Sequence, residues 1–130
     1  MKHFIIFGLL FVLLTACGES KPPFTDNGNS GQIKVIVFYD DNKNGVMDSG
    51  ETGAQAQSVI SISQDISCPP TTNPPFVDTD INGLHEFKDL KPGKYCIALS
   101  NGYAPITKMT QEVYVSSEMI TTVMVGIVKQ

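Results

Sequence analysis

One segment of the chain carries oxygen-bearing side chains at the spacing that a bound metal ion requires. This segment is the twelve-residue run from Asp40 to Glu51, with the sequence DDNKNGVMDSGE. A hard cation such as calcium binds about six to eight oxygens at roughly 2.3–2.6 Å, so the chain must coil around it and present an oxygen at alternate residues. The run matches the twelve-residue calcium-loop pattern at every defined position.

The pattern predicts a role for each ligand position. Side-chain oxygens come from Asp40, Asn42 and Asn44, a carbonyl oxygen from Val46, a direct or water-mediated contact from Asp48, and a bidentate carboxylate from Glu51. Gly45 permits the sharp bend. Because Ile33–Tyr39 has the character of a strand, the loop lacks the helix that precedes an EF-hand loop. The alternative is a solvated acidic loop, since Asp, Asn and Gly are also common in turns.

A second stretch repeats part of this pattern. Residues 78–83 have the sequence DTDING, and Asp89 occupies the twelfth place. The residues from Leu84 onward resemble a strand, and an extended chain cannot wrap around an ion to bring Asp89 back to it. We therefore expect at most a partial second metal site, which would use Asp78 and Asp80.

The inventory of reactive side chains argues against an enzyme. His85 is the one histidine after His3, and the chain has no tryptophan. A Ser/His/Asp triad would need His85, but its place in a strand-like segment is better explained by packing or exposure. A zinc site has little support, because one histidine and two cysteines far apart in sequence do not give a zinc-binding spacing. We expect a non-enzymatic protein.

The N-terminus has the features of an exported lipoprotein. Lys2 precedes an apolar run from Phe4 to Leu14, which suits a secretory signal and is shorter than the roughly 20 residues of a membrane-spanning helix. The run leads into Leu-Thr-Ala-Cys, which resembles a lipobox, so we expect cleavage before Cys17 and acylation of that cysteine. The alternative, an ordinary cleaved signal, would export the protein without an anchor.

These features predict three parts. Residues 1–16 form the lipoprotein signal peptide, residues 17–31 the lipidated cysteine and a flexible polar tether, and residues 32–130 a single domain. Gly18 stands where an inner-membrane retention Asp could have been. We therefore expect the outer membrane in a two-membrane bacterium, and otherwise the outer face of the cell membrane.

Two cysteines remain once Cys17 is assigned to the lipid. We expect Cys68 and Cys96 to form a disulfide in an oxidising compartment. The alternative is two unpaired cysteines, with Cys96 buried in a strand.

The charge pattern makes a nucleic-acid partner unexpected. The chain has 13 Asp and Glu residues against 9 Lys, no Arg, and a formal net charge of −4. Its lysines are scattered along the sequence, and guanidinium groups for phosphate recognition are absent. The expected partners are the membrane, through the lipid anchor, and an envelope or extracellular protein or glycan.

The rest of the chain alternates short β-type runs with turn signals. The expected strands are 32–39, 58–64, 76–79, 84–90, 94–99, 111–115 and 120–128. No run has a helical period. About seven strands in this length predict an all-β fold, a single Ig-like or prealbumin-like β-sandwich that carries the EF-hand-like calcium loop.

With the loop and strands in this order, the chain resembles an SdrD B-like domain, which is related to Cna B-type domains. The matching segments are 31–45, 48–53, 79–83 with Phe87 and Leu90, 92–95, and 102–105. The resemblance implies a prealbumin-like sandwich that calcium stiffens, used as a stalk or spacer without catalytic activity. The chain departs from the family in having one copy and a lipid anchor. An isopeptide cross-link is not expected, because residues 121–130 contain neither Asn nor Asp.

Two functions are consistent with these features of the sequence. The first is a calcium-stabilised structural spacer, or an adhesion or assembly component, on the cell envelope. The second is an accessory lipoprotein that binds a glycan or peptide, with Tyr39, Tyr103 or Tyr114 as contacts. The absence of tryptophan weakens the glycan version, because stacking platforms often use it.

Overall fold

Buried residues alternate with more exposed ones along most of the first and last strands of this chain. The computed structural model describes residues 24–56, 60–64, 67–71, 74–100, 102–106 and 108–129. The expected signal peptide and Cys17 lie outside these residues. In the described part of the chain, no helix has the length and hydropathy needed to cross a membrane.

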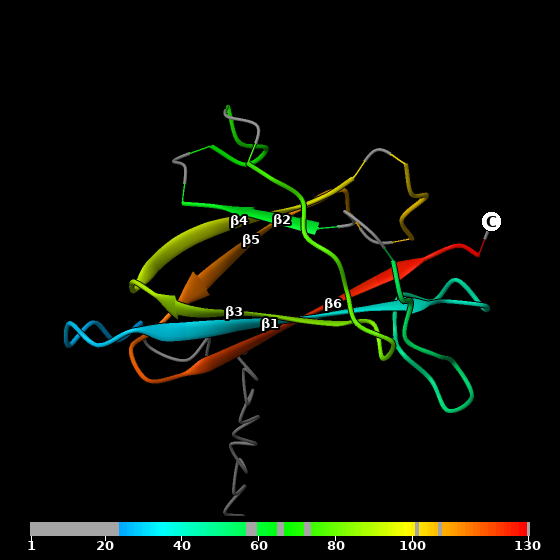
Figure 1. The fold of residues 1–130 in the computed structure, drawn as a ribbon, viewed down its shortest axis with the longest axis horizontal. Coiled ribbons are helices and arrows are strands. Elements are labelled where there is room, and N and C mark those ends of the chain that lie inside the picture. Colours follow the sequence, from blue (N-terminus) through cyan, green and yellow to red (C-terminus); the bar gives the residue numbers. More distant parts are fainter. Residues whose placement is uncertain are drawn as a thin grey trace, which may run out of the picture.

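Six strands form within the described residues. They are β1 (Gly31–Tyr39), β2 (Ile60–Ser63), β3 (Leu84–Leu90), β4 (Gly93–Leu99), β5 (Thr110–Val115) and β6 (Ile120–Ile127). They assemble into two three-stranded sheets, with the orders β3-β1-β6 and β2-β4-β5. Figure 1 shows the two sheets as facing layers, and this arrangement confirms the predicted β-sandwich.

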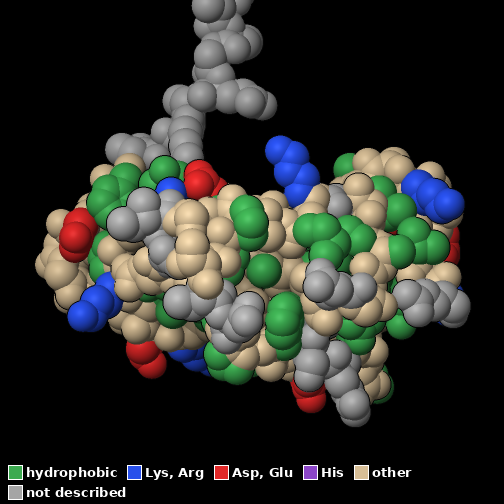
Figure 2. Space-filling view, turned by 90° about the horizontal axis from the view of Figure 1, so that it is seen from above, with side chains coloured by type: hydrophobic (Ala, Val, Ile, Leu, Met, Phe, Trp, Pro, Cys, Tyr) green, Lys and Arg blue, Asp and Glu red, His purple; other side chains and the backbone are tan. Residues whose placement is uncertain are grey.

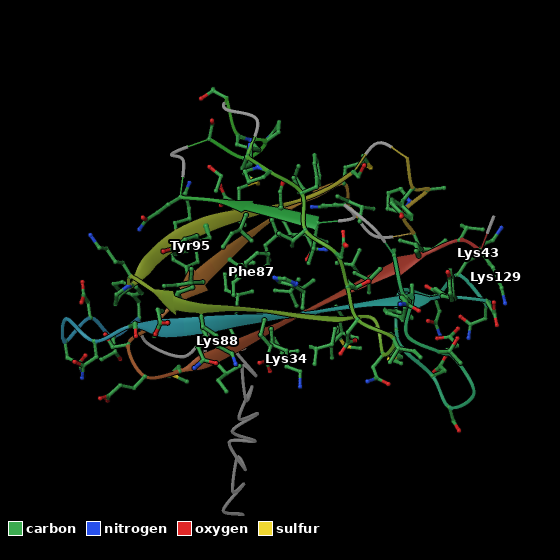
Figure 3. All side chains as sticks on the ribbon, in the orientation of Figure 1. Lys34, Lys43, Phe87, Lys88, Tyr95 and Lys129 are labelled. Atoms are coloured by element: carbon green, nitrogen blue, oxygen red, sulfur yellow. A yellow bond between two sulfur atoms is a disulfide. The ribbon has the colours of Figure 1, made fainter. Side chains whose placement is uncertain are left out.

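The core lies between the layers because successive side chains of a strand point to opposite faces. Ile33, Val35 and Val37 of β1 are fully buried, and they meet buried residues of β4, β5 and β6. Figure 3 places Tyr95 and Phe87 between the sheets and Lys34 on the other side of the β1 layer. Phe38 breaks the alternation and is also fully buried, next to the bridge that it forms with Gly53.

The first and last strands lie side by side. β1 is the central strand of its sheet, where it pairs antiparallel with β3 and parallel with β6. The parallel ladder runs from Gln32 opposite Ile120 to Tyr39 opposite Ile127. This sheet therefore combines a strand from the start of the domain with a strand from its end.

One expected strand is absent, so the prediction of about seven strands is corrected to six among the described residues. In the expected strand 76–79, only Val77 pairs, through one bridge to Ile60. The preceding Pro74 and Pro75 have no N–H to donate to a ladder. The Thr79 hydroxyl instead donates to the Ala54 carbonyl at 2.6 Å and accepts from the Ala56 N–H at 3.0 Å.

Part of the expected tether lies against the sandwich. Residues 24–30 contain no strand or helix, but they contact the turn between β5 and β6. The Ser117 N–H donates to the Thr25 carbonyl at 2.9 Å, and the Asn29 side chain donates to Glu118 Oε1 at 2.7 Å. These bonds hold the chain close to the domain from Thr25 onward.

Candidate metal site

The loop from Asp40 to Glu51 is fastened to the sandwich at both ends. At its start, the Asp40 N–H donates to the Ile127 carbonyl of β6 at 3.0 Å. At its end, the Tyr39 N–H donates to the Thr52 carbonyl at 3.0 Å, and Gly53 bridges to Phe38. The loop therefore leaves β1 and returns to β1 at the edge where β6 also ends.

Asp40 is the innermost acid of the loop, with only 2% of its surface exposed. Its Oδ1 accepts the Asn44 N–H at 3.1 Å, and its Oδ2 accepts the Gly45 N–H at 2.7 Å. Gly45 has a φ of 79°, a left-handed conformation that a glycine adopts without steric cost. The chain thus bends back over the Asp40 carboxylate.

Three further predicted ligands, Asn42, Asn44 and Asp48, are joined by side-chain hydrogen bonds. Asp48 Oδ2 accepts from the Nδ2 atoms of Asn42 and Asn44, each at 2.7 Å. These two bonds lower the pKa of the Asp48 carboxyl below its usual value, although burial opposes them weakly. Half a turn about its terminal bond exchanges the oxygen and nitrogen of an Asn amide, so either atom can point inward.

Glu51 joins the two halves of the loop because both oxygens of its carboxylate accept hydrogen bonds. Its Oε1 accepts the Asp41 N–H at 3.0 Å, and its Oε2 accepts the Asp48 N–H at 2.9 Å. The Glu51 N–H donates in turn to the Asp48 carbonyl at 3.1 Å. Position twelve of the pattern therefore lies beside positions two and nine.

Val46 contacts the loop through its backbone N–H, and its side chain is exposed to solvent. The side chain is 57% exposed, and the Val46 N–H donates to Asn44 Oδ1 at 2.7 Å. No three His, Cys, Asp or Glu side chains in the described ranges lie together as metal ligands. The carboxylates of Asp40, Asp48 and Glu51 are bonded to N–H donors. The structure therefore brings together the predicted oxygen donors without arranging them around a metal ion.

The second predicted metal site forms a turn ahead of β3. Asp80 Oδ1 accepts the N–H groups of Asn82 and Leu84, each at 2.8 Å. The Asp78 carbonyl lies 2.8 Å from Nδ1 of His85, whose ring contacts Phe87 at 4.6 Å between centroids. Asp80 therefore stabilises the turn, and a metal site at Asp78 and Asp80 stays a prediction.

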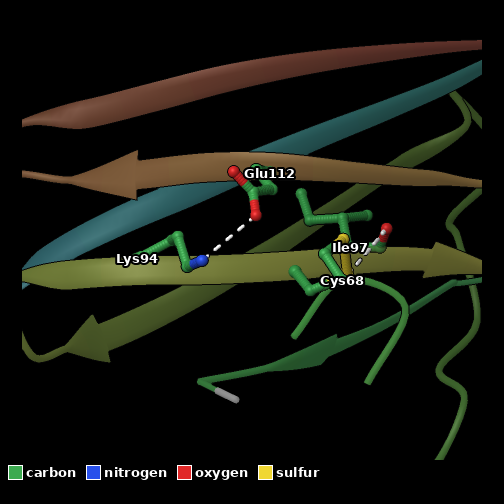
Figure 4. A network of polar contacts seen from close by, with 5 residues as sticks. Cys68, Lys94, Ile97 and Glu112 are labelled. Carbon is green, nitrogen blue, oxygen red and sulfur yellow. Dashed lines mark hydrogen bonds and ion pairs between the residues drawn. A yellow bond between two sulfur atoms is a disulfide. The ribbon is translucent and has the colours of Figure 1, made fainter. Parts of the chain in front are cut away.

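The predicted disulfide is confirmed. Cys68 and Cys96 are bonded, with 5.3 Å between their Cα atoms. Cys96 lies in β4 at the centre of its sheet, with Ser63 and Glu112 as its cross-strand partners. Figure 4 shows the bond beside the ion pair of Lys94 and Glu112, which are 3.1 Å apart.

The three tyrosines proposed as ligand contacts differ in exposure. Tyr39 and Tyr103 are partly buried against the hydrophobic core, and Lys129 lies over the Tyr39 ring at 5.5 Å. Tyr114 is 42% exposed. On the face drawn in Figure 2, apolar and uncharged polar side chains are mixed, and charged side chains lie mostly near the rim.

The sequence did not indicate the roles of Thr79 and Ser117. Thr79 is buried and connects the segment after the loop to the approach to β3. Ser117 is buried too, and its hydroxyl accepts the Asn27 N–H at 3.0 Å. Isolated hydroxyl residues of this kind carry no periodic signal that could have marked them.

This chain is similar in sequence to two curated proteins and in fold to a solved structure. Colossin-B and Colossin-A of Dictyostelium discoideum are 37% and 40% identical to it over alignments of 75 and 73 residues. These alignments cover 50% and 52% of this chain, respectively. The chain spans only 2% and 1% of the lengths of those proteins. The crystal structure of GBS52, a minor pilin of Streptococcus agalactiae, superposes with a TM-score of 0.54 at 17% identity. That match covers 78% of this chain and 45% of the pilin, and it shows likeness of fold alone.

A family model gives the more specific assignment. The model described as the SdrD B-like domain matches residues 31–123. The match begins at the first residue of β1 and ends within β6, so it includes the candidate metal loop and all or part of every strand. The chain belongs to the SdrD B-like domain family.

Proposed function

We propose that this chain is a non-enzymatic, calcium-stabilised module of the bacterial cell envelope that serves as a structural spacer or as an adhesion or assembly component. Its membership of the SdrD B-like family and its pilin-like sandwich support a structural role. The calcium site and the lipid anchor are parts of the proposal that need direct tests.

The observation that carries the calcium proposal is the arrangement of the loop 40–51. Five oxygen-bearing side chains lie within one cradle, and the innermost of them, Asp40, is fixed between the ends of β1 and β6. Hard carboxylate, amide and carbonyl oxygens are the donors that calcium prefers. When bound, the ion would replace N–H donors as the partner of these oxygens and would cross-link both halves of the loop.

Other contacts fit a structural role better than a catalytic one. The described histidine, His85, packs against Phe87 and has its Nδ1 beside the Asp78 carbonyl. The carboxylates of Asp40, Asp48 and Glu51 accept hydrogen bonds from backbone or amide N–H groups. These contacts support a role in holding turns and strands together.

The lipid anchor at Cys17 would hold this module on a membrane. We place the protein at the outer membrane in a two-membrane bacterium, and at the outer face of the cell membrane otherwise. Its partners in that setting would be the membrane and an envelope or extracellular protein or glycan.

Calcium titration tests the metal site directly. The experiment uses the chain from residue 18 onward, which contains every described strand and the whole core cluster. If calcium binds only the folded state, an ion at 100 times its dissociation constant adds about 2.7 kcal/mol to the free energy of unfolding. Calorimetry should detect binding, the melting temperature should rise with calcium, and magnesium should have a smaller effect.

Two matched variants locate the site. Glu51→Gln removes the charge of the bidentate ligand while keeping its shape, so the calcium-dependent rise in melting temperature should flatten. Glu86→Gln makes the same chemical change on β3, away from the loop, and should leave that rise intact. Absence of binding heat and of a thermal shift at millimolar calcium would refute the calcium part of the proposal.

The ligand-binding alternative has narrower support. Because Tyr39 and Tyr103 pack partly against the core, Tyr114 is the most exposed of the three proposed contacts. Binding to a glycan array or an envelope fraction that disappears on substitution of Tyr103 or Tyr114 by alanine would favour this alternative.

A further inference from the structure

The outer side of β6 is an open strand edge. Among the described residues, β6 pairs with β1 on one side and with no named strand on the other. The Ile127 carbonyl accepts from Asp40 toward β1, whereas the Gly126 carbonyl accepts from Ile106 on the opposite side. Since backbone groups alternate in direction along a strand, Thr122 and Met124 share the outward direction of Gly126.

This open edge lacks the features that keep strand edges apart. No charged residue and no proline occurs from Met119 to Val128. Ile120 is 61% exposed and Met124 is 39% exposed. Natural proteins protect exposed edges with charges, prolines, bulges or covering loops. Among the described residues, the segment that covers this edge is 104–106, and it pairs only with residues 126–128.

The other edge of the same sheet is protected and provides an internal comparison. β3 carries Glu86 and Lys88, which form an ion pair at 3.1 Å. Asp89, with a φ of 55°, interrupts the regular backbone near its end, and the pairing of β1 with β3 shifts register nearby. Of the two edge strands of this sheet, β3 therefore carries charged residues and β6 carries none.

An apolar groove runs beside the open edge. It has a volume of about 610 Å³ and lies between β5 and β6. Its lining includes the apolar side chains of Phe24, Val113, Tyr114, Met119, Val123 and Met124. Its one acid is Glu112 of β5, whose charge is paired with that of Lys94 at 3.1 Å. A strand added at β6 would cover this groove, so edge pairing would also remove apolar surface from water.

We propose that the β6 edge pairs antiparallel with the β6 edge of a second copy of this chain, about a two-fold axis at Thr122. Thr122 would face Thr122 of the second copy, and Ile120 would face Met124 of the second copy. Three outward residues, each in a hydrogen-bonded pair, would give about six backbone hydrogen bonds. Like partners meet across a two-fold axis, and this edge suits that symmetry because it brings no charges together.

The neighbouring charges are compatible with this pairing. Thr122 of β6 lies opposite Lys34 of β1, and Lys34 lies opposite Glu86 of β3, so the three residues form one cross-strand row. Lys34 and Glu86 have opposite charges. The row therefore has no net charge to repel a second copy. The cross-strand contacts of Ile120 with Met124 are the apolar pairs that stabilise adjacent strands.

Sedimentation velocity on the chain from residue 18 onward tests the proposal. The wild type should form a dimer at high micromolar concentration. Thr122→Lys and Thr122→Glu should each weaken self-association at least about tenfold, because like charges would meet at the axis. An equimolar mixture of the two variants should restore a dimer, since a lysine then faces a glutamate. Thermal melts would confirm that each variant is folded.

A control and a cross-link test the location and register. Glu86→Lys reverses a charge in the same row on the opposite edge and should leave the dimer intact. Thr122→Cys should form a disulfide-linked dimer under mild oxidation, because directly opposed residues lie within reach of a disulfide, whereas Glu86→Cys should not. A monomeric wild type would overturn the proposal, as would a dimer that Thr122→Lys leaves unchanged. Binding of lipid vesicles or peptide by a monomer through this edge would also overturn it.

Discussion

Two glycines allow the segment after the metal loop to lie directly on the turn before β3. A Cβ atom at Gly53 would overlap the backbone carbonyl of Asn82, and one at Gly83 would overlap the Val37 carbonyl. The same region is fixed by hydrogen bonds, since the Ala54 N–H donates to the Val37 carbonyl and the Val37 N–H to the Gly83 carbonyl, each at 2.8 Å. The attachment of the metal loop to the sandwich therefore depends on glycine at these two positions.

Gly53→Ala should therefore destabilise the protein. The added methyl group meets backbone, which cannot rotate away as a flexible side chain would, so we expect a loss of about 1–3 kcal/mol in the free energy of unfolding. Denaturant titration measures this loss. Gly102→Ala is the control, because the one described atom within 4 Å of its Cβ would be Ser100 Oγ, at 3.9 Å. Equal losses in the two variants would contradict the steric explanation.

At the scale of elements, the sheet β2-β4-β5 is reinforced by a covalent link. β2 is only 4 residues long, and the segment after it is joined to the middle of β4 by the Cys68–Cys96 bond. Cys96 is 1% exposed. The bond therefore connects a short strand and its following loop to the best-buried strand of the sheet.

Removing this disulfide should lower the free energy of unfolding, because the unfolded chain gains conformational entropy without the cross-link. The cysteines are 28 residues apart, and closure of a loop of this length contributes roughly 3–4 kcal/mol on the chain-entropy model. The double variant Cys68→Ala/Cys96→Ala should lose about this much in denaturant unfolding. Reduced wild type should match the double variant, and a wild type that is equally stable when reduced would contradict the expectation.

A buried phenol in β4 should make stability fall at alkaline pH. Burial raises the pKa of Tyr95, whose hydroxyl donates to the Lys91 carbonyl at 3.0 Å. Below the unfolded-state pKa of about 10 its contribution to stability is fully present, and it is lost as the pH rises through the higher folded-state pKa.

Tyr95→Phe should remove this part of the alkaline loss. Urea unfolding of the variant and the wild type between about pH 9 and 11 gives the comparison. Tyr114→Phe, on the outer side of β5, is the matched control. Parallel stability curves for wild type and Tyr95→Phe would contradict the assignment.

The strands were predictable to the extent that one face of each is buried. Ile33, Val35 and Val37 alternate with more exposed neighbours, and the same period marks β6. The segment 76–79 has β-type residues but forms only one bridge, because its prolines and the contacts of the Thr79 side chain replace a ladder. Local composition did not contain that tertiary information.

The sequence predicted which residues of the candidate site carry oxygen ligands, but it did not predict their contacts with the rest of the fold. The spacing from Asp40 to Glu51 identified the oxygen-bearing residues that lie together in the folded loop. It could not show that Asp40 packs at the junction of β1 and β6, since β6 is about eighty residues later in the sequence. Likewise, the binding of residues 25–29 to the turn at Ser117 depends on contacts between distant segments.

At the scale of the whole molecule, the proposed anchor predicts where the protein resides. Cys17→Ser would keep the signal and remove the acylated sulfur, so the protein should move from the membrane fraction to a soluble fraction. The loss follows from the membrane affinity that acyl chains supply, about 0.8 kcal/mol for each buried CH₂ group. Gly18→Ala, at the adjacent position, should stay with the membrane. Membrane retention of a Cys17→Ser protein that has lost residues 1–16, as shown by its mass, would contradict the lipid anchor.

The parallel pairing of β1 and β6 has a mechanical consequence. Because these strands run in the same direction along the whole of β6, the start of β1 and the end of β6 lie at opposite ends of their ladder. Tension between a support upstream of Gly31 and a load beyond Ile127 would act lengthwise on that ladder. Its rungs would then share the force and have to rupture together, which is the geometry that resists stretching.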